Sequence, residues 1–433
     1  MKSFTGLFAA VECLLLLGVN TSGVSALSSY VSQNTAKISL DEKEYRDIQT
    51  MEQWARDCGC QTCDGFQITT YDQKNHFAST NQNLAAGSPI LFVPAQMVLS
   101  SNAIKQEFGN GLDAAEAELQ RTNLGWQIPT FRLFCKILFE FEKGTDSPYY
   151  PWLNSLPRLF KNGAAMTFAC FEALPPYAAN LSMKERQYSV SFQTVVEEVP
   201  FLSENTKVDS VLLKWAYSIA VTRSFDWEGD KRIAPLGDYF NHGAEPEIQL
   251  SYDQDGNLLV YALRDLPSGS PLRYCYADPY NPTPLFARYG FLDESAPGAF
   301  CKLMDKLDEM EELGYGFSNL LFYKENGEVS PEVYDVLLYS ILKENDPSGA
   351  DAFRNAVIQK DEGTKNGYHQ QYFQYTLDAL KKHVNSFLEE LTQLSNKART
   401  YNLDTHPRVP VILRHNDHVR TTFERVRANL ENM

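Results

Sequence analysis

The chain has 433 residues, 43% of them hydrophobic and 22% charged, which suits a globular protein but exceeds what one compact core holds. Its formal net charge is −16, so the chain lacks the excess of basic residues that binding to phosphate groups requires. This argues against a nucleic-acid-binding protein. Beyond the first 26 residues, no segment approaches the ~18 consecutive apolar residues of a membrane helix. We therefore expect no stable membrane insertion of the mature chain.

The N-terminus has the pattern of a targeting peptide. Lys2 precedes an apolar run over residues 7–19, which Glu12 interrupts. The small residues of "VSA", which ends at Ala26, are typical of a signal-peptide cleavage site. This pattern predicts a signal peptide over residues 1–26.

Residues 27–40 contain no acidic residue and are rich in Ser, Thr, Gln and Asn. Transit segments have this composition, and so do disordered linkers, so both interpretations stay open. We expect the mature chain to begin near Leu27 and the protein to reach the secretory pathway or a plastid. The alternative is a cytoplasmic protein.

The first folded elements follow this segment. Tyr45, Ile48, Met51 and Ala55 recur at helical spacing, which predicts a short amphipathic helix. The apolar run "PILFVP" at 89–94 is bounded by prolines and favours a strand.

A cysteine cluster lies between this helix and this strand. Cys58, Cys60 and Cys63 offer three thiolates, but structural zinc sites need four ligands, and His76 is the one nearby candidate for a fourth. We therefore predict no metal site.

From about residue 103 to 221 the pattern is helical. One face is predicted to contain Phe131, Phe134, Leu138 and Phe141, and another to contain Val208, Val211, Leu212, Trp215 and Ile219. Next, "EIQLSY" and "LLVYAL" flank "DQDGN", which predicts a β-hairpin, because Gly after Asp tolerates a positive φ.

After Ala296 the sequence turns helical again. One stripe runs through Phe373, Leu377, Leu380, Val384, Phe387, Leu391 and Leu394, and a second through Val419, Phe423, Val426 and Leu430. These stripes predict a helical domain over residues 297–433.

Five motifs together resemble one known family. They are "SPYYPWLNSLP" at 147–157, "TRSF" at 222–225, "PLGDYFNH" at 235–242, "YCY" at 274–276 and "YGF" at 289–291. In this order the chain resembles the SET-domain protein methyltransferases of the Rubisco large-subunit lysine methyltransferase branch, over about residues 41–433.

The resemblance implies an α+β fold. A SET domain of small β-sheets would span 41–296, with a helical insertion at about 103–221, and an all-α substrate-binding domain would span 297–433. It also implies S-adenosylmethionine as cofactor and a lysine side chain of a protein as substrate. We expect a monomer.

Site roles are also implied by the resemblance. Tyr276 matches the catalytic tyrosine, and Tyr289 matches the second tyrosine of the site. The matching cofactor-binding positions are Arg223, Phe225, Asp238, Asn241, His242 and Phe291.

The chain departs from the family where a "G-x-G-x-x-A" element is usual. Here "NHFAST" replaces it at 75–80, and Phe77 stands at a position that normally passes against the cofactor. Tyr276 is also followed by Ala277 rather than by glycine.

The leading hypothesis is therefore an S-adenosylmethionine-dependent protein-lysine N-methyltransferase. A protein-histidine methyltransferase is one alternative, because the motifs do not separate the two acceptors. A degenerate SET module that binds a protein partner without catalysis is the other, because the glycine element is missing.

Overall fold

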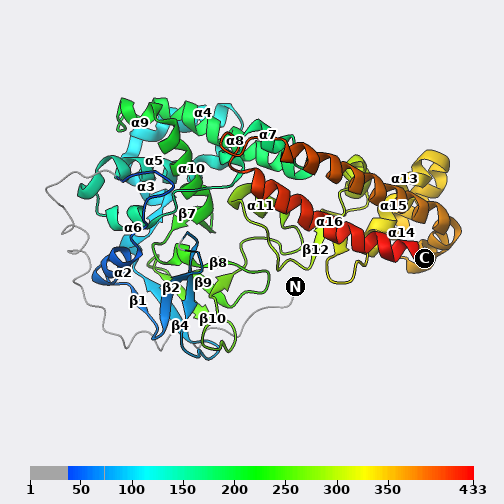
Figure 1. Cartoon of the computed structure of the whole chain (residues 1–433), viewed down its shortest axis with the longest axis horizontal. Coiled ribbons are helices and arrows are strands. Elements are labelled where there is room, and N and C mark those ends of the chain that lie inside the picture. Colours follow the sequence, from blue (N-terminus) through cyan, green and yellow to red (C-terminus); the bar gives the residue numbers. More distant parts are fainter. Residues whose placement is uncertain (1–37, 73) are drawn as a thin grey trace.

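The computed structural model describes residues 38–72 and 74–433 (Figure 1). The predicted signal peptide over residues 1–26 lies outside the described residues, as do residues 27–37 of the predicted linker or transit segment. No helix within the described ranges is both long and apolar enough to cross a lipid bilayer.

The β part of the described chain consists of small sheets. The largest has the order β1-β4-β10-β9, and its strands span Gln61–Thr62, Pro89–Val93, Leu258–Ala262 and Ile248–Tyr252, all antiparallel. The other sheets pair β2 (Phe66–Thr70) with β3 (His76–Thr80), β7 (Asp230–Ile233) with β5 (Leu99–Ser100) and β6 (Phe225–Trp227), β8 (Asn241–His242) with β11 (Arg273–Tyr274), and β12 (Gly298–Phe300) with β13 (Leu321–Tyr323).

The strand predicted at 89–94 is confirmed as β4, and the predicted hairpin is confirmed as β9 and β10. Gly256 takes a φ of +85°, as the turn requires. The Asp253 carboxylate accepts hydrogen bonds from the backbone N–H groups of Asp255 and Asn257, so it stabilises the turn.

Along the chain, a long series of helices separates β5 from β6. Helix α2 (Ile48–Asp57) confirms the predicted opening helix, although Tyr45 lies before it and is exposed. The helices between β5 and β6 are α3 (Ser101–Phe108), α4 (Asp113–Arg121), α5 (Ile128–Glu142), α6 (Tyr150–Ser155), α7 (Phe168–Phe171), α8 (Pro176–Val195), α9 (Glu204–Val208) and α10 (Ser210–Arg223).

Two predicted core positions in this region are wrong. Leu212, Trp215 and Ile219 are buried as expected, but Val208 is 76% exposed and Val211 is 62% exposed. A single helix was expected there, whereas Val208 ends α9 and α10 begins at Ser210, with the Asp209 carboxylate capping it. The break turns both valines away from the core.

The C-terminal region begins with the two-stranded β12–β13 sheet, and α12 (Leu307–Glu312) lies in the connection between these two strands. It continues with α13 (Pro331–Asn345), α14 (Pro347–Gln359), α15 (Glu362–Arg399) and α16 (Val409–Glu431). Helices α15 and α16 lie side by side (Figure 1). Both predicted stripes contribute to one buried cluster, with Leu380, Val384, Phe423 and Val426 at its centre, whereas Phe373 is 46% exposed.

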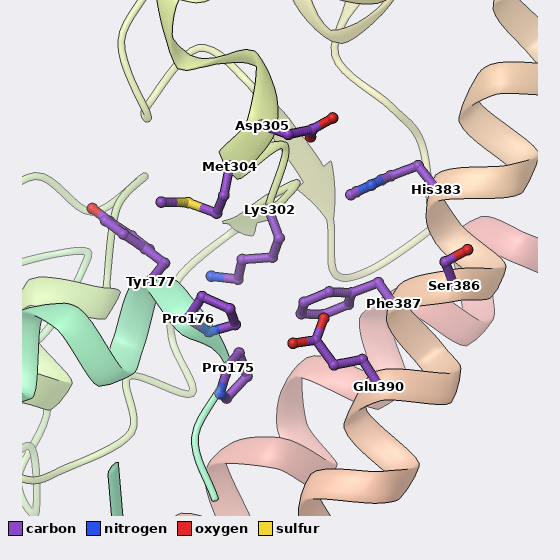
Figure 2. A pocket seen from close by; sticks show the side chains of 10 residues that line it. All are labelled: Pro175, Pro176, Tyr177, Lys302, Met304, Asp305, His383, Ser386, Phe387 and Glu390. Carbon is purple, nitrogen blue, oxygen red and sulfur yellow. The ribbon is translucent and has the colours of Figure 1, made fainter. Parts of the chain in front are cut away.

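The start of α8 and the middle of α15 face each other across a cavity of about 230 Å³ (Figure 2). The turn that follows β12 closes the third side. The cavity therefore lies where the inserted helices meet the C-terminal helices.

Candidate active site

The candidate site forms where the short strands β8 and β11 end. These strands are parallel, with Asn241 opposite Arg273 and His242 opposite Tyr274. Parallel strands bring their carboxyl ends to the same edge of a sheet, so His242 meets Tyr276, which follows β11 by two residues. The two ring centroids are 5.3 Å apart.

Helix α11 (Thr283–Tyr289) brings two further aromatic rings to this edge. The ring of Tyr289 lies 4.9 Å from that of Tyr276, and the ring of Phe291 lies 6.3 Å from it, edge to face. Gly290 makes this turn possible: its φ is +77°, and a Cβ there would lie 2.4 Å from the Lys161 carbonyl carbon. The glycine of "YGF" is thus required by the backbone.

His242 is fixed by its two ring nitrogens. Its Nδ1 accepts the backbone N–H of Tyr276 at 3.1 Å, so its proton lies on Nε2, which donates to Asp293 at 2.8 Å. Burial alone would raise the pKa of Asp293, but the hydrogen bonds from His242 and Ser295 lower it below the ordinary value. His242 therefore positions Tyr276 and is not available as a general base.

The Tyr276 hydroxyl donates a 2.7 Å hydrogen bond to the Phe240 carbonyl. Burial, and to a smaller extent the nearby Tyr289, raise the pKa of Tyr276 above its ordinary value, so the hydroxyl keeps its proton at neutral pH. Burial likewise raises the pKa of Tyr289 to about 12. Both groups can orient a ligand through oxygen lone pairs, but neither is a base.

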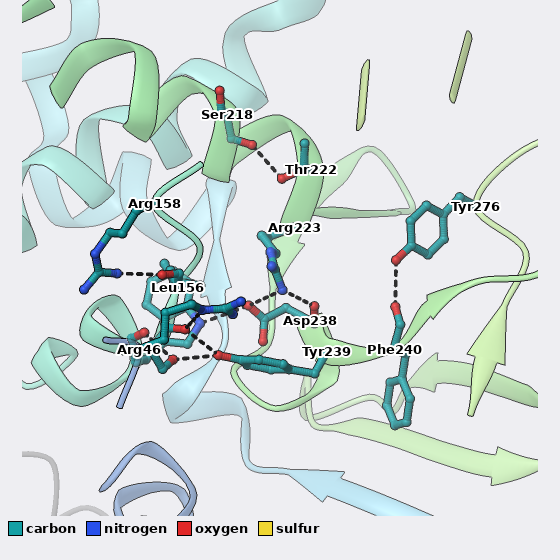
Figure 3. Close-up of polar contacts among 12 residues, drawn as sticks. Arg46, Leu156, Arg158, Ser218, Thr222, Arg223, Asp238, Tyr239, Phe240 and Tyr276 are labelled. Carbon is teal, nitrogen blue, oxygen red and sulfur yellow. Dashed lines mark hydrogen bonds and ion pairs between the residues drawn. The ribbon is translucent and has the colours of Figure 1, made fainter. Parts of the chain in front are cut away.

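A cluster of buried charges lies beside Phe240 (Figure 3). Arg223, the last residue of α10, donates to the Asp238 backbone carbonyl at 2.5 Å and forms an ion pair with its carboxylate at 3.6 Å. Trp152 Nε1 donates to the same carboxylate at 3.1 Å. Burial nevertheless raises the pKa of Asp238, since Arg223 opposes the effect of burial only in part.

Arg46 joins this cluster and was missed by the sequence analysis. It is 7% exposed, and two of its guanidinium nitrogens donate to the Ser155 and Lys74 carbonyls at 2.7 Å. Its third, Nη2, is buried without a hydrogen-bond partner among the described residues, as is Asp238 Oδ1. Two guanidinium groups thus face one carboxylate, and the N–H groups of Arg46 Nη2 have no acceptor among the described residues. An isolated arginine far upstream in the sequence gives no signal of this kind.

Strand β3 contains most of the residues that replace the glycine element. The Phe77 ring packs on Tyr71, with centroids 4.9 Å apart. Alternation along a strand places His76 on the opposite face. Burial and the charge of Arg46 lower the pKa of His76, so this neutral ring is the one that faces the charge cluster.

The two remaining predicted positions differ in exposure. Asn241 is exposed, and no hydrogen bond involves its side chain within the described structure. Phe225 is buried and packs on Tyr274 at 5.3 Å. Tyr274, the first tyrosine of "YCY", also lies 4.6 Å from Tyr276, so it belongs to the ring cluster although it was not predicted there.

The cysteine cluster lies elsewhere. Cys58 and Cys60 are buried, and Cys60 contacts the Met97 sulfur at 3.4 Å. Burial raises the pKa of the Cys58 thiol to about 11. In the described part of the chain, no three His, Cys, Asp or Glu side chains are grouped to hold a metal ion.

Comparison with solved structures identifies the fold. The SET domain of LSMT bound to lysine and AdoHcy superposes with a TM-score of 0.58 at 16% identity, over 89% of this chain and 91% of that one. Rubisco LSMT bound to AdoMet superposes with a TM-score of 0.57 at 15% identity, over 89% and 92%. The chain has the Rubisco LSMT SET fold. The predicted α+β class and the predicted resemblance are confirmed at this level.

The chain is also similar in sequence to one curated protein. Over 239 residues the chain is 22% identical to the actin-histidine N-methyltransferase of Danio rerio, a match that covers 52% of this chain but only 38% of the relative. No family model matches the sequence. Within the SET fold, the predicted residues Tyr276, Tyr289, Phe291 and His242 contact one another, while their roles stay predictions.

Proposed function

We propose that the protein is an S-adenosylmethionine-dependent protein methyltransferase and that its acceptor is a lysine side chain. The observation that carries this proposal is the ring cluster of Tyr276, Tyr289 and Phe291, which His242 fixes at the open ends of β8 and β11. Solved structures with this fold bind AdoMet, AdoHcy, lysine and monomethyllysine, which supports the same ligands here.

The residues present fit the cofactor. Arg46 and Arg223 would hold its carboxylate, because Asp238 neutralises only one of these two charges and Arg46 Nη2 has no partner in the described structure. The exposed Asn241 amide and the Phe291 ring would bind its polar and adenine parts. Phe77 does not oppose this, since its ring lies against Tyr71.

When bound, the cofactor supplies an activated methyl group. The protein must then align a neutral amine and exclude water. A free lysine has a pKa of about 10.4, and a wall of aromatic rings disfavours its ammonium form. The Tyr276 oxygen, whose proton is directed at Phe240, would orient the amine without removing its proton.

Two alternatives are distinguished by experiment. A histidine acceptor is supported by the curated relative, although that match covers less of the chain than the LSMT structures do. A degenerate module without catalysis was suggested by the missing glycines. The Arg46 guanidinium nitrogen that has no hydrogen-bond partner among the described residues weighs against it.

Calorimetry with S-adenosylmethionine tests the cofactor site. The parent protein should bind, and Asn241→Ala should weaken binding roughly tenfold or more, because a hydrogen bond to a charged group is lost. The control is Asn345→Ala, an exposed asparagine at the end of α13. Absence of binding by the parent at millimolar cofactor would favour the degenerate module.

Methyl transfer with radiolabelled cofactor tests the ring cluster. Tyr276→Phe should lower kcat while leaving cofactor affinity nearly unchanged, since its hydroxyl would contact the reacting amine and methyl group. Tyr280→Phe, a nearby exposed tyrosine, serves as control. Acid hydrolysis of the labelled product identifies methyl-lysine or methyl-histidine directly. Equal turnover of Tyr276→Phe and parent would remove this residue from catalysis.

A further inference from the structure

The cavity between α8 and α15 contains a buried lysine that has no anionic partner among the described residues (Figure 2). Lys302 lies in the turn after β12 and is 5% exposed. No ion pair of the described chain includes it. Buried lysines are rare unless they are paired, because an unpaired buried charge is costly.

The contacts of Lys302 are all neutral. Its Nζ donates a long 3.4 Å hydrogen bond to the Thr283 hydroxyl and lies 5.3 Å and 5.5 Å from the ring centroids of Tyr177 and Phe300. These rings attract a cation only weakly compared with a carboxylate. The backbone of Lys302 also has a φ of +64°, a strained conformation for a residue with a side chain.

Three titratable groups close to Lys302 do not supply a negative charge. Burial raises the pKa of the Cys301 thiol to about 12 and raises that of Tyr177, so both stay protonated. On α16, burial and then the charge of Lys302 lower the pKa of His415 to about 3. Burial lowers the pKa of Lys302 itself to about 8, which leaves it mostly charged at neutral pH.

Helix α15 forms the opposite wall. His383 donates through Nε2 to the Cys301 carbonyl at 2.7 Å, and burial lowers the pKa of this ring, so Nδ1 carries a lone pair. Phe387 adds an apolar surface, and Ser386 lies at the open rim. Glu390 lines the same cavity, yet it forms no ion pair with Lys302.

We propose that this cavity binds a small monocarboxylate with an apolar body, whose carboxylate pairs with Lys302. The unpaired charge of Lys302 can pair with one ligand carboxylate. Glu390 and Asp305 on the cavity wall would repel a second carboxylate on the ligand. The apolar body lies against Phe387, Met304 and Pro175. A volume of about 230 Å³ is below the usual range for drug-sized ligands, so the ligand is small. This site is separate from the tyrosine cluster and does not depend on the proposed methyl transfer.

Titration with benzoate and with its neutral isostere benzamide tests the proposal. Calorimetry measures the affinity, and protein NMR chemical shifts report which residues the ligand contacts. The parent should bind benzoate saturably and benzamide much more weakly. Lys302→Met keeps the aliphatic stem and should weaken benzoate binding roughly tenfold or more. Lys382→Met, an exposed lysine on α15, should bind like the parent. Absence of saturable benzoate binding, or equal affinity in Lys302→Met, overturns the proposal.

A second variant keeps Lys302 in place. Ser386→Phe puts a ring at the rim of the cavity without touching the charge, so it should also abolish benzoate binding. The site is supported if benzoate changes the NMR chemical shifts of the cavity residues alone in the parent, and if these changes are lost in this variant. Benzoate binding that persists in Ser386→Phe places the ligand elsewhere and contradicts the proposal, whatever the fate of Lys302→Met.

Discussion

Two buried aspartates show how differently this chain treats charge in its helical C-terminal region and in the candidate site. Asp335, on α13, has a fully buried carboxylate that accepts hydrogen bonds from Tyr315 and His369 at 2.7 Å and pairs with Lys365 at 2.9 Å. These bonds lower its pKa although burial opposes them. The carboxylate of Asp238 is equally buried, but one oxygen has no described partner and burial raises its pKa.

The difference distinguishes a buried charge that stabilises the fold from one that is suited to bind a ligand. A buried charge that is fully hydrogen-bonded holds elements together, and Asp335 joins α13 to α15 in this way. A buried charge left partly unsatisfied costs stability and is typical of sites that bind a ligand. Asp238, Arg46 and Lys302 belong to this second kind.

The sharpest test of the comparison is Asp335→Asn. It keeps the shape but leaves Lys365 and the Tyr315 hydroxyl without their anion, so the free energy of unfolding should fall by about 4 kcal/mol. Urea unfolding at pH 7 measures this. Asp226→Asn removes an exposed pair with Lys231 and should cost less than about 1 kcal/mol. Similar losses in both variants would show that Asp335 is not a structural anchor.

The opposite sign is expected for Lys302→Met. The ordinary lysine pKa of 10.5 falls to about 8 here, so removing the charge should raise the free energy of unfolding by on the order of 3 kcal/mol at pH 7. The facing groups are Cys301 in the same turn, Tyr177 on α8, His383 and Glu390 on α15, His415 on α16, and Asp305.

The pH dependence of this gain follows from the same shift. Between pH 8 and 10.5 the unfolded chain binds more protons than the folded one, so the parent becomes more stable as pH rises. The gain in Lys302→Met should therefore be greatest below about pH 8 and shrink toward pH 10.5. Unfolding curves at pH 7 and pH 10 check this, and a variant less stable than the parent at pH 7 contradicts it.

Sequence patterns predicted the fold well where local rules decide. The hairpin at β9–β10 follows from alternation and one glycine, and the stripes on α15 and α16 follow from helical period. The exposed Val208 and Val211 show the limit, because a capping aspartate broke a helix that the period alone predicted as continuous.

The candidate site was predictable only in part, for a physical reason. Tyr276, Tyr289 and Phe291 lie in motifs that a resemblance can recognise. Arg46 and Asp293 reach the site through tertiary contacts, with no local pattern to mark them. The contact of the Phe77 ring with Tyr71 could not be predicted either, because it depends on how β2 and β3 pair.

Asp238→Asn should change the stability less than Asp335→Asn or Lys302→Met does, and so complete the comparison. Burial already raises the pKa of this carboxyl, and the asparagine oxygen can still accept from Trp152 Nε1, so the loss should be about 1 kcal/mol. Arg223 keeps its bond to the backbone carbonyl but loses the charge that orients it. Affinity for S-adenosylmethionine, measured by calorimetry, should therefore change by a larger factor than stability does. Asp335→Asn, assayed below its unfolding transition, should bind the cofactor like the parent. A loss of stability in Asp238→Asn as large as that in Asp335→Asn, with unchanged cofactor affinity, would make Asp238 a structural residue and remove the contrast between the two regions.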